Sequence, residues 1–347
     1  MRLVTFVPPD GLPRAGALLG AALVDLAAAA PLALEDAEGL AWDMLSLLRA
    51  DQDAVSLESA ADILAALTQM LGGEPDLAGF PDDLDDPLYQ SATEDLDGSL
   101  SIGGAALIYP LTQVRLLAPL PRPASLRLYD AFEEHAIAVA TLRGNSLPGA
   151  WYRGPALAFG NHGAIYGPGA PILLPPGEML DYGLSLACVI GRSGRDLDRD
   201  EAQTAIAGYC LANSWANHDH DELERLLGRG PGKSRDFATS LGPWLVTSDE
   251  LEMYAGDDGR LSLSLIAEVN GLTQIRATAA LQYYPFADLV ADASRHTTLV
   301  PGDVIIAGPL AGGTLLEQTS GYGPWLAPGD IVELSGTGLG SLTNRLE

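Results

Sequence analysis

The densest group of possible metal ligands in this sequence is the stretch NHDHDELE. It places five such side chains at consecutive positions: His218, Asp219, His220, Asp221 and Glu222. Imidazole and carboxylate groups together can bind a transition-metal ion. The same run is typical of a solvated helix start, because the positive end of the helix dipole favours acidic residues in the first turn. We favour the helix start, and a metal site remains the alternative.

A second stretch, LDYGLSLACVIG (180–191), has the pattern of a buried strand with two unusual residues. At the period-2 spacing of a strand, Tyr182, Leu184 and Leu186 share one face. Gly183 and Ser185 share the other. A strand face made of glycine and a small serine typically lies against a ligand or another backbone, so we expect this face to line something.

Common catalytic motifs are missing from the sequence. It has no G-x-S-x-G, no phosphate-binding P-loop, no H-E-x-x-H and no Cys-x-x-Cys. The two cysteines, Cys188 and Cys210, lie in apolar runs and are predicted to be buried and inert. The GTGLG stretch near the C-terminus has no helix after it, so it predicts a tight turn instead of a dinucleotide site.

The composition indicates an acidic protein with ample material for a core. Of 347 residues, 47% are hydrophobic, and 46 Asp and Glu against 19 Lys and Arg give a formal charge of -27. Such a field repels nucleic acids and anionic lipids, so neither is an expected partner. The sequence shows no signal peptide and no apolar stretch long enough to span a bilayer, which predicts a cytoplasmic protein.

The first part of the chain predicts a small α+β domain over residues 1–112. A short strand is expected at 1–6, a second strand running into a helix at 17–27, and helical segments between 40 and 72. The segment 76–98 is rich in acids and is expected to be a solvated linker. Its spacing does not match a calcium-binding loop.

The remainder, 113–347, is expected to be a larger domain with a mostly β core and a few helices. Short β-rich runs alternate with Gly/Pro turns, and Pro-Gly-Asp turns at 301–303 and 328–330 each open a β segment. Helices are expected at 130–142, 198–215 and 284–296. Asp198 and Glu201 have the spacing of a capping box at the start of the second helix. The fold class is therefore α+β.

Five stretches in this part, taken in order, carry a family resemblance. They are VRLLAPLPRPASLRLYDAFEEHA, MLDYGLSLACVIG, LANSWANHD, GRGPGKSRDFATSLGPWLVTSDEL and ASRHTTLVPGDVIIAGPLAGGTLLE. Together they resemble the fumarylacetoacetate hydrolase superfamily from about residue 113 to the end, and the start resembles that family's small N-terminal domain. The resemblance implies a mixed β-roll, a homodimer, and a reaction on an oxo acid: hydrolysis, decarboxylation, dehydration or tautomerisation.

The resemblance also identifies this chain as a divergent member at the family's metal site. Active members carry four carboxylates that bind Mg²⁺ or Mn²⁺, and this sequence has Leu128, Gly183, Ser185 and Ser214 at those positions. Hard divalent ions need oxygen ligands, largely anionic ones. Asp130 is two residues from the first position, roughly 6.5 Å along a strand, too far to substitute without a bulge. We therefore expect no metal cofactor.

Two residues implied to be catalytic are retained. His135 matches the histidine that family hydrolases use to activate water, and Glu317 matches the glutamate that orients it. The resemblance implies substrate contacts from three basic residues: Arg235, Lys233 and Arg143. Pro309 stands where the family has a threonine. His162 and His296 have no family counterpart and are expected at the surface or in loops.

The predicted function is a metal-independent enzyme that acts on a small anionic oxo acid or related carbonyl compound. It would use a His–Glu general base for hydrolysis, tautomerisation, cyclisation or dehydration. The alternative is a non-catalytic binding protein or partner subunit, and an ordinary metal-dependent acylpyruvase-type hydrolase ranks third. A hydrogen bond between His135 and Glu317 beside an open pocket would favour the enzyme, whereas a pocket filled by leucines would favour the binding protein.

Overall fold

The structure is a computed structural model, which describes residues 1–9, 11–20, 22–35, 39–49, 55–71, 101–102 and 105–347. The predicted acidic linker, 76–98, lies outside these residues. Within the described part of the chain, no helix is both long and apolar enough to cross a membrane.

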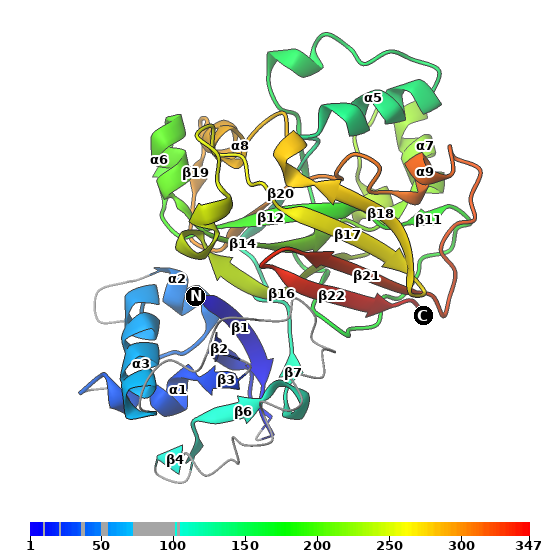
Figure 1. Cartoon of the computed structure of the whole chain (residues 1–347). Helices are drawn as coiled ribbons and strands as arrows, with labels where there is room; N and C mark the ends of the chain where they lie inside the picture. The colour runs from blue at the N-terminus through cyan, green and yellow to red at the C-terminus, as the bar shows by residue number, and fades with distance from the viewer. Residues whose placement is uncertain (10, 21, 36–38, 50–54, 72–100, 103–104) are drawn as a thin grey trace.

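The molecule is built around a large mixed sheet (Figure 1). Its described strands lie in the spatial order β6 (Ile108–Pro110), β3 (Ala22–Asp25), β2 (Arg14–Leu19), β1 (Arg2–Val7), β16 (Thr239–Thr247), β14 (Ile206–Asn213), β12 (Leu184–Ile190), β20 (Asp303–Ala307), β8 (Ser125–Tyr129) and β9 (Leu157–Phe159). Two more strands pair at its side, β7 (Arg115–Leu116) with β1 and β10 (Ile165–Tyr166) with β16. The β20–β8 and β10–β16 pairs are parallel and the others antiparallel. The predicted α+β class with a mixed sheet is confirmed.

A second, antiparallel sheet has the order β18 (Leu272–Thr278), β17 (Ser264–Val269), β21 (Ile331–Gly336) and β22 (Gly340–Arg345). Short pairs flank the two sheets: β4 (Ser101–Ile102) with β5 (Ala105–Ala106), β11 (Leu180–Asp181) with β15 (Ala216–Asn217), and β13 (Gly194–Arg195) with β19 (Thr298–Leu299). The GTGLG stretch connects β21 to β22 as the predicted turn.

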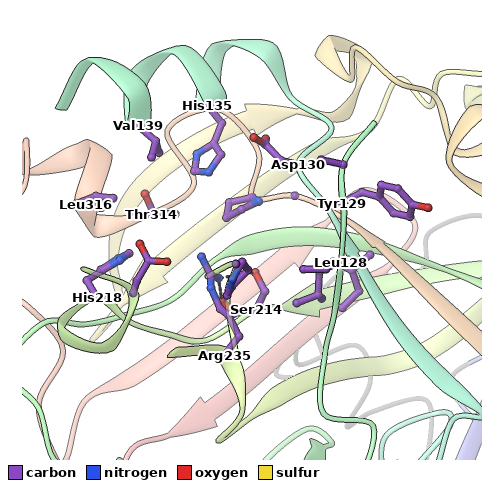
Figure 2. Close-up of a pocket in the computed structure, with 18 of the residues that line it drawn as sticks. Leu128, Tyr129, Asp130, His135, Val139, Ser214, His218, Arg235, Thr314 and Leu316 are labelled. Carbon is purple, nitrogen blue, oxygen red and sulfur yellow. Dashed lines mark hydrogen bonds between the residues drawn. The ribbon is translucent and has the colours of Figure 1, made fainter. Parts of the chain in front are cut away.

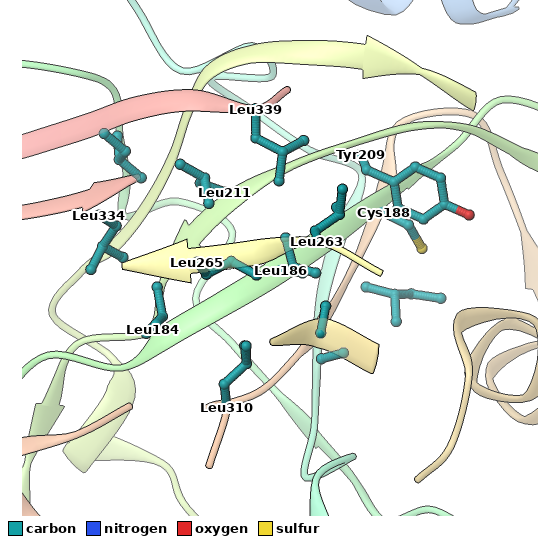
Figure 3. Close-up of a cluster of buried hydrophobic side chains, with 14 of the residues drawn as sticks. Leu184, Leu186, Cys188, Tyr209, Leu211, Leu263, Leu265, Leu310, Leu334 and Leu339 are labelled. Atoms are coloured by element: carbon teal, nitrogen blue, oxygen red, sulfur yellow. The ribbon is translucent and has the colours of Figure 1, made fainter. Parts of the chain in front are cut away.

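Strand β12 supplies side chains to both cores of the molecule. Leu184, Leu186 and Cys188 lie in the cluster shared with the second sheet (Figure 3). Ala187 and Val189, on the opposite face, lie in a second cluster with the N-terminal helices. Burying one leucine contributes roughly 1.5–3 kcal/mol, so this alternation fixes which face of β12 is available to a site. The predicted facing of this strand is confirmed.

The N-terminal strands extend the main sheet, because β1 pairs antiparallel with β16. Helices α1 (Leu26–Ala29), α2 (Met44–Arg49) and α3 (Leu57–Met70) pack beside these strands. The predicted single strand before the first helix is wrong: β2 and β3 form a hairpin there. The division of the chain at 112/113 stays a prediction.

Three helices concern the site: α5 (Glu133–Leu142), α7 (His218–Leu226) and α9 (Leu315–Gln318). Two others lie elsewhere on the C-terminal part, α6 (Arg199–Thr204) and α8 (Phe286–Ser294). The capping box at the start of α6 is present, but the predicted helix over 198–215 is wrong beyond its first turns. From Ile206 the chain enters β14, because its apolar run completes the sheet between β12 and β16. Tertiary pairing therefore overrides local helical periodicity there.

Candidate active site

A cavity of about 430 Å³ opens where α5, α7, β8 and the loops beside β20 converge (Figure 2). Its volume is in the range typical of small-molecule sites. The lining residues with polar or titratable side chains are Tyr129, Asp130, His135, Arg143, Ser214, His218, Asp221, Arg235 and Thr314. Leucines contribute to the walls, but they leave the cavity open.

His135 and Glu317 form a buried pair at this cavity. The Nδ1 atom of His135 lies 2.8 Å from Oε2 of Glu317, and the two side chains are 10% and 7% exposed. Glu317 is held in turn, because its Oε2 accepts from the Thr314 hydroxyl and its Oε1 from the backbone N–H of Gly312. No described residue hydrogen-bonds the Nε2 atom of His135. The ring is therefore oriented at one nitrogen and available at the other.

A second histidine–carboxylate pair lines the same cavity. The Nε2 atom of His218 lies 3.0 Å from Oδ2 of Asp181, whose side chain is fully buried. The two carboxylate oxygens of Asp181 also accept the backbone N–H groups of Leu315 and Leu316, the first two residues of α9. Asp181 therefore fixes both His218 and the helix that carries Glu317.

The face of Gly183 and Ser185 lies against Ser214, as the strand pattern predicted that it would line something. Ser185 Oγ donates to the carbonyl of Gly183 at 3.0 Å and lies 3.3 Å from Ser214 Oγ. A Cβ added to Gly183 would lie 2.5 Å from Ser214 Oγ, and one added to Gly308 would lie 2.3 Å from Ser185 Oγ. Neutral hydroxyls and backbone carbonyls thus fill this region. Leu128 and Ser214 also line the cavity.

The three basic residues predicted to bind substrate have different positions. Arg235, in the 3-10 helix η4 (Lys233–Arg235), lines the cavity and donates from Nη1 to the Ser214 carbonyl at 2.8 Å. It forms no ion pair with any described residue. Arg143 lines the cavity but is paired with Asp221. Lys233 is exposed, pairs with Asp236, and is not among the lining residues.

Burial lowers the pKa of Arg235, and the charges of Asp221 and Asp181 act in the opposite direction. A guanidinium group has so high an intrinsic pKa that it stays charged at neutral pH. Arg235 is therefore a fixed positive charge at the wall of the cavity, with hydrogen-bond donors left for an anion.

Asp130 contributes a carboxyl group beside His135, and Figure 2 shows the Asp130 side chain extending toward the histidine, whose ring points from α5 into the cavity. Its Oδ2 accepts from Trp151 Nε1 at 3.3 Å, while its buried Oδ1 has no hydrogen-bond partner among the residues that the structure describes. Burial raises the pKa of Asp130, although nearby His135 and the hydrogen bond from Trp151 oppose that shift. From the sequence, Asp130 was predicted only to lie too far from the first family ligand position to replace it.

The NHDHDELE stretch forms the predicted helix start, with Asn217 as the N-cap of α7. Its side chains do not gather around one point: Asp219 accepts backbone N–H groups of Glu178 and Met179, and Asp221 pairs with Arg143. In the described ranges, no three His, Cys, Asp or Glu side chains are grouped as a metal site. The expectation of a solvated start is wrong for His218, whose side chain is only 10% exposed and contacts Asp181.

The exposure of the remaining histidines and of the cysteines agrees with the sequence predictions. His162 is exposed, and the side chain of His296 is 91% exposed, as expected for surface residues. Both cysteines are buried and free, and burial raises the pKa of each, to about 12 for Cys210. The importance of Asp181 was missed. Its place in a buried strand segment was a usable signal, because a buried carboxylate requires partners.

Comparison with known proteins identifies the family. Residues 127–347 match the model described as "Fumarylacetoacetate (FAA) hydrolase C-terminal", which is more than half of the chain. The chain belongs to the fumarylacetoacetate hydrolase family. The matched range spans the positions of the two histidine–carboxylate pairs described above.

Among the fumarylacetoacetate hydrolase relatives, Protein Rv2993c of Mycobacterium tuberculosis is 30% identical over 237 residues, 68% of this chain and 80% of that protein. The 2,4-didehydro-3-deoxy-L-rhamnonate hydrolase of a Sphingomonas species is 31% identical, over 51% of this chain and 60% of its own length. The maleylpyruvate hydrolase of Aquipseudomonas alcaligenes is 34% identical, over 47% and 49%. This chain thus matches about half to three-fifths of the length of the two named hydrolases.

Solved structures show the same fold over the whole chain. The fumarylacetoacetate hydrolase of Exiguobacterium antarcticum is 22% identical with a TM-score of 0.64, and covers 100% of this chain and 99% of its own. The maleylpyruvate hydrolase of a Sphingobium species is 19% identical with a TM-score of 0.61, over 100% and 99%. At these identities the likeness establishes the fold.

Proposed function

We propose that this protein is an enzyme that acts on a small oxo acid or a related carbonyl compound, with His135 as its general base. The observation that carries the proposal is the hydrogen bond of 2.8 Å between His135 Nδ1 and Glu317 Oε2 beside a cavity of about 430 Å³. The named relatives that act on rhamnonate-derived and maleylpyruvate substrates support this substrate class.

The His135–Glu317 pair has the arrangement that a general base requires. With Nδ1–H donating to Glu317, the neutral ring keeps its lone pair on Nε2, where water or an acidic C–H can approach. The carboxylate then stabilises the imidazolium that forms when the proton arrives. Thr314 and Gly312 hold the carboxylate, so the ring does not have to reorganise during the step.

Arg235 supplies the binding of an anionic group. Its guanidinium is charged, half-buried and free of ion pairs with described residues, so a substrate carboxylate can accept two parallel hydrogen bonds from it. Arg143 is already neutralised by Asp221 and adds less attraction. We therefore assign the substrate carboxylate to Arg235 and the reacting carbon or water to the side of His135.

We further propose that the reaction does not use a divalent ion at the position implied by the family resemblance. Ser185, Ser214 and the Gly183 carbonyl offer only neutral oxygen atoms, and two of these already hydrogen-bond each other. Magnesium and manganese favour carboxylate oxygens, so this donor set does not fit them. The steric contact at Gly183 leaves no room for a longer side chain.

The test measures turnover of acylpyruvates and related diketo acids, followed by the loss of enol absorbance. It compares a variant of the cavity histidine with a variant of a surface histidine. His135→Asn is expected to reduce turnover by about 100-fold or more. The exposed His162→Asn serves as the matched control and is expected to retain the wild-type rate. Turnover that survives in His135→Asn contradicts the proposed base. Binding of these acids without turnover in the wild type would instead establish a non-catalytic binding protein.

A further inference from the structure

The cavity contains a second imidazole with the same support as the proposed base. His218 Nε2 lies 3.0 Å from the carboxylate of Asp181, just as His135 Nδ1 lies 2.8 Å from that of Glu317. Both histidine side chains are 10% exposed, and both line the cavity. Each ring is thus oriented through one nitrogen by a buried carboxylate.

The two pairs are built on one short helix. Asp181 accepts the backbone N–H groups of Leu315 and Leu316, and the next residue of α9 is Glu317. The histidines themselves come from different elements, α5 and α7, and Figure 2 shows them at different sides of the cavity. The positions of both rings are therefore fixed relative to the same turn of backbone.

His218 makes two structural contacts, the hydrogen bond to Asp181 and packing against Trp325 with 5.4 Å between ring centroids, and they leave one of its ring nitrogens unused. Asp181 already accepts hydrogen bonds from two backbone N–H groups, which is enough to hold it at the start of α9. The Nδ1 atom of His218 has no hydrogen-bond partner among the described residues. A ring held at one nitrogen and open at the other is suited to proton transfer with a bound molecule.

We propose that His218 is a second acid–base group and that the cavity interconverts the keto and enol forms of an enolisable 2-oxo acid. This inference rests on the proposed function, in which Arg235 holds the substrate carboxylate and His135 is the base. It adds the group that serves the carbonyl oxygen. With Arg235 engaged by the carboxylate, that oxygen needs another proton donor as it becomes an enol.

The step balances without an oxidant or other co-reactant. The C3–H bond of the substrate breaks, and its proton goes to Nε2 of neutral His135. The electron pair forms the C2–C3 double bond, and the carbonyl oxygen takes a proton from Nδ1 of protonated His218, forming the O–H bond. Ketonisation reverses both transfers. Exchange with solvent protons resets the two rings.

The experiment follows deuterium entry at C3 of 2-oxobutyrate in D₂O by NMR, with a chelator present throughout. His218→Gln is the informative variant, because its amide can still donate to Asp181 in place of Nε2 but has nothing in place of Nδ1. We expect the exchange rate at saturating 2-oxobutyrate to fall about 100-fold or more, with an unchanged thermal unfolding midpoint. His220→Gln, on the same helix but outside the cavity lining, is expected to exchange at the wild-type rate.

A second variant separates chemistry from folding. In His218→Ala, added imidazole is expected to restore part of the lost rate, because a free imidazole can occupy the vacated space. A His218→Gln rate within about threefold of wild type, or no restoration of His218→Ala by imidazole, overturns the inference. His135→Asn keeps the two proposals distinct: if it exchanges at the wild-type rate, the proposed function fails as well. A wild type that turns over acylpyruvates but does not exchange deuterium into 2-oxobutyrate overturns the inference alone.

Discussion

Replacement of Glu317 by glutamine perturbs the proposed base without emptying any space. In the wild type, Glu317 accepts hydrogen bonds from His135, Thr314 and Gly312. Glutamine retains an acceptor oxygen for Gly312, but its NH₂ group would face His135. The imidazole would then have to accept at Nδ1, which places its proton on Nε2, the nitrogen that has to be a base.

The expected magnitude follows from the lost charge. Two unit charges about 4 Å apart at an effective dielectric constant of 20 attract by about 4 kcal/mol, and every 1.4 kcal/mol is a factor of ten in rate. Loss of the Glu317 carboxylate therefore predicts a decrease of about 10³-fold in kcat. Because Arg235 is unaffected, KM should change little.

The assay is steady-state turnover of the best acylpyruvate substrate by Glu317→Gln, His135→Ala and the double variant. Since the two residues act as one unit, the double variant should be no slower than His135→Ala alone. Thermal unfolding of each variant reports whether the fold is retained. A Glu317→Gln variant within about fivefold of wild type, or a double variant whose losses multiply, would refute the description of Glu317 and His135 as a coupled base.

Three other predictions test the surroundings of the pair. Arg235→Lys should raise KM by about tenfold or more because the bidentate contact is lost, whereas Lys233→Ala should leave KM unchanged; steady-state kinetics with one carboxylated substrate measures both. Gly183→Ala should lower the free energy of unfolding by about 1–3 kcal/mol, because the new Cβ would lie 2.5 Å from Ser214 Oγ. Gly149→Ala, with open space around it, should have little effect, and denaturant unfolding measures both variants. Burial raises the pKa of Asp130 in the folded state, so the free energy of unfolding declines as pH rises from the pKa of the unfolded state to that of the folded state. Asp130→Asn should therefore be more stable than wild type at pH 7 but not below about pH 4. Equal differences in stability at the two pH values would contradict this sign.

Much of the fold could be predicted from local pattern. Period-2 alternation in 180–191 correctly separated Leu184 and Leu186 from Ser185, because the two faces of β12 pack against different parts of the molecule. The capping box at Asp198 was correct for the same reason, since it depends on residues three apart. The strand at Ile206 was missed because its place in the sheet is decided by β12 and β16, distant in sequence.

The candidate site was only partly predictable. The resemblance named His135 and Glu317, and the structure brings these residues, 182 positions apart, into hydrogen-bond contact. His218 was interpreted as a solvated residue because it begins an acidic helix. Its burial follows from the contact with Asp181, a long-range pairing that no local pattern reports. Lys233 was predicted to contact substrate by resemblance, but it lies outside the cavity lining and pairs with the nearby Asp236.

Metal dependence of the wild-type enzyme tests the central claim most directly. Turnover of the best acylpyruvate or 2-oxo acid substrate would be measured after exhaustive treatment with a chelator, and again after Mg²⁺ or Mn²⁺ is added back. The neutral donor set of Ser185, Ser214 and the Gly183 carbonyl predicts the same rate in all three conditions, with His135→Asn inactive in each. A rate that disappears with the chelator and returns with the ion would contradict the account, because a divalent cation site would then support the reaction.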